Sequence, residues 1–310
     1  MRHAIFGAST LLGSRLLQRL IESGEEVMAY DADPDAAATR SVPIHRCDPD
    51  RDLLEPQQFF GIESIDCAYW CVKSPTFRAF PVGAGKLFSM NVAGPARAAE
   101  AAAAAGARAF ISVASGSLYQ PRWEAIPETA DFQHFNPYAL SAIAGEQALH
   151  VIHAGKPRFG VLCLRLFGLF GPGQAQGLVP GLIKRVRSGS GIALPPHPDD
   201  KATDANGLQL SVTYVDDAAV CIEQLAKLVH AGRVKDRVLN LAGPEPTTIR
   251  RMAELIGRSL HLVPHYETPM RPRDGEFIAD ISRLSQLVNV PQTPLDEAME
   301  RTVAAAPSAA

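Results

Sequence analysis

Short apolar runs alternate with helix-favouring segments through the first 166 residues of the chain. The apolar runs have the length of buried strands and cover residues 4–6, 27–30, 65–72, 109–113 and 160–165, and a further short strand is expected near 42–46. The segments between them favour helices, most clearly at 16–21, 86–105 and 139–154. Strands that alternate with helices are typical of a parallel sheet covered by helices on both faces. The pattern therefore predicts a doubly wound α/β fold.

The character of the chain changes at residue 167, beyond which glycines and prolines are frequent. Helices are expected at 178–187 and 249–258, and one more strand at 238–241. Asn206-Gly207 is a turn signal and predicts the tip of a hairpin between the apolar runs 192–194 and 210–212. We expect much of this part to form a second, smaller lobe towards the C-terminus.

The first 31 residues contain a strand, a glycine turn, a helix and a second strand. The turn is Gly7-Ala8-Ser9-Thr10-Leu11-Leu12-Gly13. Such a turn binds a pyrophosphate, because the helix N-terminus offers backbone N–H groups and a partial positive charge. Asp31, at the end of the second strand, can accept hydrogen bonds from both hydroxyls of an adenosine ribose and repels a 2′-phosphate. The unit predicts a Rossmann-like site for NAD rather than NADP; the alternative is a plain strand–helix–strand unit with glycines at its turns.

One position of the turn departs from this pattern. Thr10 occupies the place of the middle glycine, whose missing side chain lets the backbone approach the phosphates. A β-branched residue there predicts a pyrophosphate that is shifted outward or held more weakly.

Composition excludes several other classes of protein. The 310 residues carry a net charge of −3, and no block of five or more basic residues occurs, so nucleic acid and anionic membranes are not expected partners. No apolar run reaches the roughly 18 residues of a membrane span, and no signal-peptide pattern follows Met1, which predicts a cytoplasmic protein. The five cysteines form no metal-type pair and are expected as buried thiols.

Several stretches, in their order and spacing, resemble the extended short-chain dehydrogenase/reductase family, in particular its epimerase/dehydratase members that act on nucleotide sugars. The resemblance covers nearly the whole chain. Besides the glycine turn and Asp31, it rests on residues 91–94 (Asn-Val-Ala-Gly), 113–119 (Val-Ala-Ser-Gly-Ser-Leu-Tyr), 136–142 (Asn-Pro-Tyr-Ala-Leu-Ser-Ala), 164–173 (Leu-Arg-Leu-Phe-Gly-Leu-Phe-Gly-Pro-Gly), 212–217 (Val-Thr-Tyr-Val-Asp-Asp) and 271–274 (Arg-Pro-Arg-Asp).

The resemblance implies a catalytic set in which a tyrosine exchanges a proton with a substrate hydroxyl. By position the tyrosine is Tyr138, and the serine that hydrogen-bonds the same oxygen is Ser115. Asn91 matches an asparagine that kinks the long helix and supports a proton-relay water, with a helix cap as the alternative. The lysine that lowers the tyrosine's pKa in the family would stand at position 142, where this chain has Ala142. Without that charge, a tyrosine with a pKa near 10 is only about 0.1% ionised at neutral pH.

The same alignment of motifs predicts the remaining contacts. The cofactor is expected against Gly7, Ser9, Thr10, Leu11, Leu12, Gly13, Asp31, Asp48, Cys71 and Lys73, although a solvated lysine in the loop 73–85 is the favoured interpretation of Lys73. The substrate is expected against Ser117, Tyr119, Arg165 and Arg271. Leu210 stands about where many such enzymes place a further arginine, which weakens the case for a nucleotide-sugar substrate.

These implications define the expected organisation and three candidate functions. The NAD-binding domain is expected to comprise residues 1–166 and about 208–243, the substrate-binding lobe about 167–207 and 244–310, and the assembly a homodimer through the alanine-rich helix and the helix after Tyr138. The first candidate is an NAD-linked epimerase, dehydratase or ketoreductase on a sugar-like or other small polar substrate. The second is a catalytically silent homologue that serves as scaffold, sensor or partner subunit. The third is a non-redox lyase or isomerase on the same fold.

Overall fold

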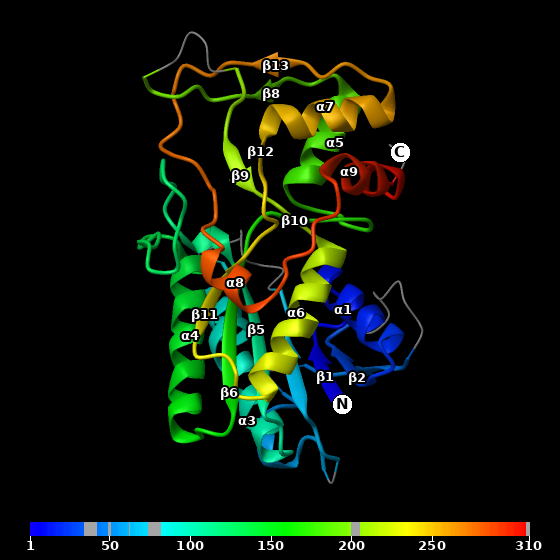
Figure 1. The fold of residues 1–310 in the computed structure, drawn as a ribbon, viewed down its shortest axis with the longest axis vertical. Helices are drawn as coiled ribbons and strands as arrows, with labels where there is room; N and C mark the ends of the chain where they lie inside the picture. The colour runs from blue at the N-terminus through cyan, green and yellow to red at the C-terminus, as the bar shows by residue number, and fades with distance from the viewer. Residues whose placement is uncertain (34–41, 49–50, 62, 74–81, 200–204, 308–310) are drawn as a thin grey trace.

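A parallel sheet is the centre of the molecule in the computed structural model, which describes residues 1–33, 42–48, 51–61, 63–73, 82–199 and 205–307. Within these residues the main sheet has seven strands in the order β11-β6-β5-β4-β1-β2-β3 (Figure 1). Every pair is parallel. The strands are β1 (Arg2–Phe6), β2 (Glu26–Asp31), β3 (Ile44–Arg46), β4 (Cys67–Trp70), β5 (Ala109–Ser115), β6 (Gly160–Leu166) and β11 (Val238–Leu241).

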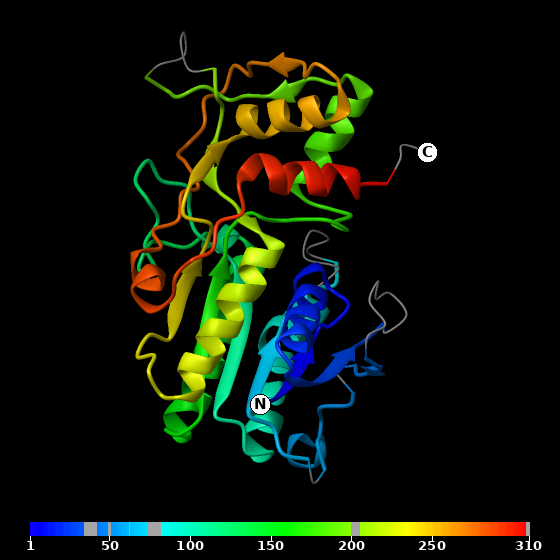
Figure 2. The same cartoon turned by 45° about the vertical axis from the view of Figure 1, so that its right-hand side comes forward.

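Helices cover both faces of this sheet. On one face α1 (Leu11–Glu22) and α6 (Val215–His230) lie against each other and bury an apolar layer that includes Leu16 and Ile222 (Figure 2). On the other face α3 (Gly94–Ala104) and α4 (Pro137–Gly155) pack on a second layer that includes Phe6 and Phe110. The strand order reverses beside β1, which is the arrangement of a Rossmann-like doubly wound sheet. The predicted fold class is confirmed.

The helix expected at 86–105, with an interruption at Gly94-Pro95, is divided into three parts. These parts are α2 (Ala84–Phe88), a π-helical segment η3 (Ser89–Ala93) and α3. Pro95 has no N–H, so it cannot donate to the carbonyl of Asn91 four residues earlier. The Gly94 N–H instead donates to the Ser89 carbonyl, which is the wider spacing of a π-helix. Residues 74–81 of the loop predicted before this helix lie outside the described residues.

A second group of elements lies above the sheet in Figure 1 and has its own apolar core. It contains α5 (Leu178–Ser188), α7 (Ile249–Leu260) and α9 (Leu295–Ala304). Short strand pairs complete it: β7 (Leu169–Phe170) with β10 (Thr213–Tyr214), β8 (Ile192–Ala193) with β13 (Tyr266–Glu267), and β9 (Gln209–Ser211) with β12 (Pro246–Thr248). The shorter elements η2 (Pro56–Gln58), η4 (Gly116–Leu118) and α8 (Ser282–Leu287) belong to connections.

The predicted hairpin between residues 192–194 and 210–212 is wrong. Gly207 does adopt the left-handed conformation of a turn, with φ at 70°. However, β8 pairs with β13 and β9 pairs with β12, so the two expected partners belong to different sheets. A turn dipeptide fixes only its local backbone, whereas the strands found their hydrogen-bonding partners in the C-terminal part of the chain.

The connections between the two groups cross the predicted domain boundaries. Strand β9, which the sequence assigns to the NAD-binding domain, pairs in the second group, whereas Leu284 of α8 packs in the core of the main sheet. The boundaries themselves stay a prediction.

No helix in the described parts of the chain is long and apolar enough to cross a membrane.

Candidate dinucleotide and catalytic site

The glycine turn between β1 and α1 is built so tightly that side chains are excluded at both of its ends. Gly7 has φ at +85°, and a Cβ there would lie 2.6 Å from the Val72 nitrogen at the end of β4. A Cβ on Gly13 would lie 2.0 Å from the Gly7 carbonyl oxygen. The first turn of α1, with Leu11 and Leu12, therefore begins directly at the end of β1, with its first N–H groups outside the helical ladder.

Thr10 is the N-cap of α1, and its hydroxyl is used inside the turn. The Oγ1 atom accepts a hydrogen bond from the Gly13 N–H at 3.1 Å and lies 2.7 Å from the Gly7 carbonyl oxygen, to which it donates. It also lies 3.2 Å from the Cys71 carbonyl oxygen. The threonine thus replaces the flexibility of a glycine with a capped, cross-linked turn. Its effect on a bound pyrophosphate stays a prediction.

Asp31 lies at the end of β2, next to the same turn. Its Oδ2 accepts from the Ser9 N–H at 3.0 Å, and its Oδ1 accepts from the Asp33 N–H at 3.1 Å. A carboxylate has about four acceptor sites, and hydrogen bonds within the described residues occupy two, which leaves two for ribose hydroxyls. The negative charge at this edge disfavours a 2′-phosphate. The turn, the helix N-terminus and the carboxylate together fit an NAD molecule.

The other predicted cofactor residues occupy three different environments. Cys71 is buried behind the turn, where burial raises the pKa of its thiol to about 12. Lys73 is exposed at the start of the loop after β4. Asp48 follows β3, and its backbone N–H donates to Asp52 Oδ2 at 2.7 Å. Their contact with a cofactor stays a prediction.

Tyr138 and Ser115 come together at the carboxyl end of the sheet. Ser115 ends β5, and Tyr138 lies in the first turn of α4. Burial raises the pKa of the Tyr138 phenol to about 12, and a hydrogen bond with Ser115 opposes that shift. The Ser115 hydroxyl also lies 2.9 Å from that of Ser117 and accepts from the Ser117 N–H at 3.1 Å. The two residues that the resemblance pairs are therefore neighbours.

Position 142, one helical turn after Tyr138, is apolar and closed. Ala142 is 7% exposed and packs with Leu118, Phe167 and Ala242. The charge of the Glu146 carboxylate raises the pKa of Tyr138 further. With a pKa of about 12, about one tyrosine in 10⁵ is ionised at pH 7. The site therefore holds Tyr138 as a neutral phenol.

Asn91 contacts α4 through its side chain. Its Nδ2 donates to the Ser141 hydroxyl at 2.9 Å, and that hydroxyl donates to the Tyr138 carbonyl oxygen at 2.9 Å. The predicted relay through a water stays a prediction. Sequence reasoning missed Ser141, because a serine inside a helix gives no signal of its own partner.

Tyr119 and Arg165, predicted as substrate contacts, lie in a buried polar network. The Arg165 guanidinium makes a bidentate pair with Glu146, at 3.0 and 2.6 Å, and donates to the Tyr119 hydroxyl at 2.5 Å and to the Glu128 carbonyl at 2.8 Å. The Tyr119 hydroxyl donates to Asn240 Oδ1 at 2.9 Å. Arg165 is 4% exposed and Tyr119 fully buried. These contacts join β6, β11 and α4 inside the protein, so neither residue belongs to the proposed substrate site.

Ser117 and Arg271, the other two predicted substrate contacts, are exposed. Ser117 lies beside Ser115, as described above. Arg271 precedes the segment that pairs with Arg122, and its guanidinium contacts the Asp274 carboxylate at 3.0 Å. Ser117 therefore contacts Ser115, the neighbour of Tyr138, whereas Arg271 pairs with Asp274.

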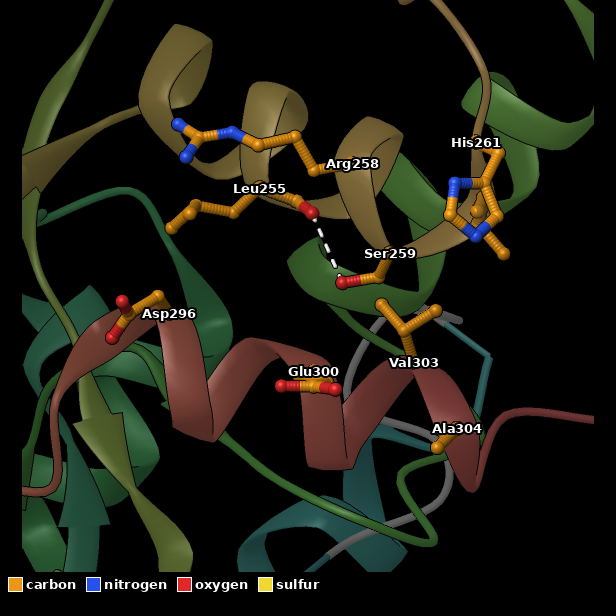
Figure 3. Close-up of a pocket in the computed structure, with 9 residues that line it drawn as sticks. Leu255, Arg258, Ser259, His261, Asp296, Glu300, Val303 and Ala304 are labelled. Carbon is orange, nitrogen blue, oxygen red and sulfur yellow. Dashed lines mark hydrogen bonds between the residues drawn. The ribbon is translucent and has the colours of Figure 1, made fainter.

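A surface cavity of about 490 Å³ lies between α7 and α9 (Figure 3). Arg258, Ser259 and His261 line one side, and Asp296 and Glu300 the other. None of the predicted site residues borders it. Among the residues that the structure describes, no group of three or more histidine, cysteine, aspartate or glutamate side chains is arranged to hold a metal ion.

Comparison with known proteins identifies the family. The profile of the NAD dependent epimerase/dehydratase family matches residues 4–242, and the chain belongs to this family. This confirms the resemblance noted in the sequence and the expectation of NAD as cofactor.

Individual relatives are distant. A UDP-glucose 4-epimerase of Mycolicibacterium smegmatis is 28% identical over 171 residues, so the match spans 49% of this chain and about half (51%) of that relative. A UDP-glucose 4-epimerase of Streptomyces lividans is 24% identical and matches over 88% of this chain and 85% of its own. The solved UDP-glucuronic acid 4-epimerase of Bacillus cereus, in complex with UDP-glucuronic acid and NAD, superposes with a TM-score of 0.78 at 20% identity over 98% of each chain.

Proposed function

We propose that this protein binds NAD and interconverts a hydroxyl and a carbonyl group on a nucleotide-sugar or similar small polar substrate. Tyr138 exchanges the proton with the substrate oxygen, and Ser115 hydrogen-bonds the same oxygen. The observation that carries the proposal is the hydrogen bond between these two residues at the carboxyl end of the sheet. Ligands of doubly wound sheets bind at that end. The relatives named as UDP-sugar epimerases support the choice of substrate class.

The cofactor residues in this proposal are those of the turn after β1. Gly7 and Gly13 give the backbone its close approach, the N-terminus of α1 faces the pyrophosphate, and Asp31 holds the adenosine ribose. NAD, when bound, takes up and returns the hydride that moves during the reaction. The chain's own side chains supply the proton and orient the substrate oxygen.

The two half-reactions make unequal demands on Tyr138. Reduction of a carbonyl needs a proton donor, and a neutral phenol hydrogen-bonded to Ser115 supplies one. Oxidation of a hydroxyl needs a proton acceptor, and only about one tyrosine in 10⁵ is ionised at pH 7. The oxidation step is therefore the slow one at neutral pH.

Arg271, exposed beside Asp274, is available to a diphosphate group.

Ala142 favours a second candidate, a homologue that binds NAD or a sugar-like ligand without turning it over. This interpretation rests on the apolar, buried Ala142 in place of a lysine, and on the raised pKa of Tyr138. Such a protein would serve as a scaffold, sensor or partner subunit. A third candidate, a non-redox lyase or isomerase, would turn over a substrate with no change in the absorbance of bound NAD.

The experiment begins with calorimetric titration of cofactor-stripped protein with NAD and with NADP. The proposal expects NAD to bind and NADP to bind much more weakly, and Asp31→Asn to reduce that preference, because the substitution removes the charge and keeps the shape. A panel of nucleotide sugars is then tested with Tyr138→Phe as the control. NAD binding without turnover of any of them, even at alkaline pH, would favour the silent homologue. Turnover that survives in Tyr138→Phe would contradict the assigned role of the tyrosine.

A further inference from the structure

The backbone of Tyr138 is held by side chains on both of its peptide groups. Its N–H donates to the Oδ1 of Asn136, the N-cap of α4, at 3.0 Å. Its carbonyl oxygen accepts from the Ser141 hydroxyl at 2.9 Å. The position of the phenol along the helix axis therefore depends on these two contacts as well as on the helical ladder.

Ser141 is itself fixed by a second residue from another helix. It is completely buried, and its Oγ lies 2.9 Å from Asn91 Nδ2. An amide nitrogen can only donate, so the hydroxyl oxygen accepts from Asn91 and its single proton points to the Tyr138 carbonyl. The chain of donors runs in one direction, from Asn91 through Ser141 to Tyr138.

The segment that carries Asn91 is shaped for this contact. Asn91 belongs to the π-helical segment 89–93, which lies directly against α4. A Cβ on Gly145, one turn after Ser141, would lie 2.0 Å from the Asn91 carbonyl oxygen. Only a glycine on α4 permits this approach. Inserted π turns are uncommon and recur at functional sites.

We propose that Ser141 is a positioning residue for Tyr138, and that the Asn91 side chain acts through it. The hydrogen bonds from Asn91 to Ser141 and from Ser141 to the Tyr138 carbonyl position the phenol relative to Ser115. In this site Ala142 offers no ammonium group that could do so. The inference rests on the proposed function, in which Tyr138 transfers the proton. It assigns Asn91 a direct contact in place of a purely solvent-mediated role.

The test combines a signal from the phenol with steady-state kinetics. Protein carrying ¹³Cζ-labelled tyrosine gives one resonance for each of its six tyrosines, and Tyr138→Phe identifies the Tyr138 resonance. Ser141→Ala is expected to shift this resonance selectively and to lower kcat about ten- to a hundredfold with KM changed far less, since small misplacements of a reacting group have effects of this size. Ser141→Thr, which keeps the hydroxyl, should restore both towards the wild type.

Thr302→Val is the matched control. The Thr302 hydroxyl is also buried and donates to the carbonyl four residues earlier, at 2.6 Å, but it lies on α9. This variant should leave the Tyr138 resonance unchanged. Asn91→Asp is the second route if Ser141→Ala does not fold, because an aspartate accepts the serine proton and withdraws it from Tyr138.

Each result decides the proposal. The proposal is overturned if the Tyr138 resonance does not shift in Ser141→Ala. If that variant does not fold, an unshifted resonance in Asn91→Asp overturns it in the same way. An equal shift of the resonance in Thr302→Val also overturns it. The resonance is read without substrate, so it decides the positioning role even if the protein turns over no nucleotide sugar. Absence of turnover in the unaltered protein, with the predicted shifts present, would keep the positioning role of Ser141 and reject the proposed function instead.

Discussion

Placing a lysine at position 142 is the perturbation that most directly tests why Tyr138 is neutral. Positions four apart on a helix bring their Cβ atoms within about 5 to 6 Å, so the ammonium group introduced by Ala142→Lys can come within about 5 Å of the phenolate. At an effective dielectric constant of about 20, two unit charges at that distance attract by about 3 kcal/mol. That energy raises the phenolate population of Tyr138 at neutral pH about 150-fold.

Ala142→Lys should therefore increase both the ionisation of Tyr138 and the rate of the oxidation step. Ionisation is measured by the near-ultraviolet absorbance of the phenolate during a pH titration, as the difference from the same variant carrying Tyr138→Phe. Turnover is measured with a substrate found in the nucleotide-sugar panel, where the gain at neutral pH should approach the gain in phenolate if proton removal limits the rate.

The control must separate charge from size, because Ala142 is packed and a long side chain strains its surroundings. Ala142→Met has a similar length and no charge, and it should leave the titration of Tyr138 unchanged. An equal titration in the lysine and methionine variants would refute the electrostatic reasoning. A shifted titration with no gain in turnover, in protein that binds NAD, would show that the missing charge does not limit catalysis.

Three further predictions concern stability, pH and assembly. Arg165→Met leaves Glu146 buried without its partner and should lower the free energy of unfolding by about 3 to 5 kcal/mol, whereas replacing both residues by methionine should lower it less. Urea unfolding of the single and double variants measures this, and equal losses of stability would contradict it. Because the pKa of Tyr138 is about 12, the oxidation rate should rise about tenfold per pH unit from about pH 6 to about pH 9, while the reduction rate does not change with pH. Initial rates measured in the two directions check this, and an oxidation rate that levels off near neutral pH would indicate another base. Leu140 and Val151 are 42% and 72% exposed on α4, and changing both to glutamate should convert the expected homodimer to monomer by sedimentation. An unaltered protein that sediments as a monomer would contradict the homodimer.

The sequence was informative wherever function depends on local backbone chemistry. The turn from Gly7 to Gly13 was predicted because close approach and a left-handed φ require glycine at defined positions. The alternation of buried strands and helices likewise predicted the doubly wound sheet, which the comparisons confirm. Family motifs placed Ser115 and Tyr138 among the candidates, and the structure then brought them together.

Side-chain partners distant in the chain could not be predicted in the same way. Arg165 and Tyr119 fitted a substrate site as residue types, and the tertiary structure instead buries them against Glu146 and Asn240. Thr10 looked like an obstruction, although in the folded turn its hydroxyl caps Gly13.

The sequence alone determined the fold class, the dinucleotide turn and the absence of a lysine at position 142. Only the tertiary structure decided which polar groups are hydrogen-bonded within the protein. Examples are the Arg165 network and the contact of Ser141 with Asn91, 50 residues apart. The physical reason is that secondary structure and turns depend on neighbouring residues, whereas a buried polar group must find a partner wherever the chain folds back on itself.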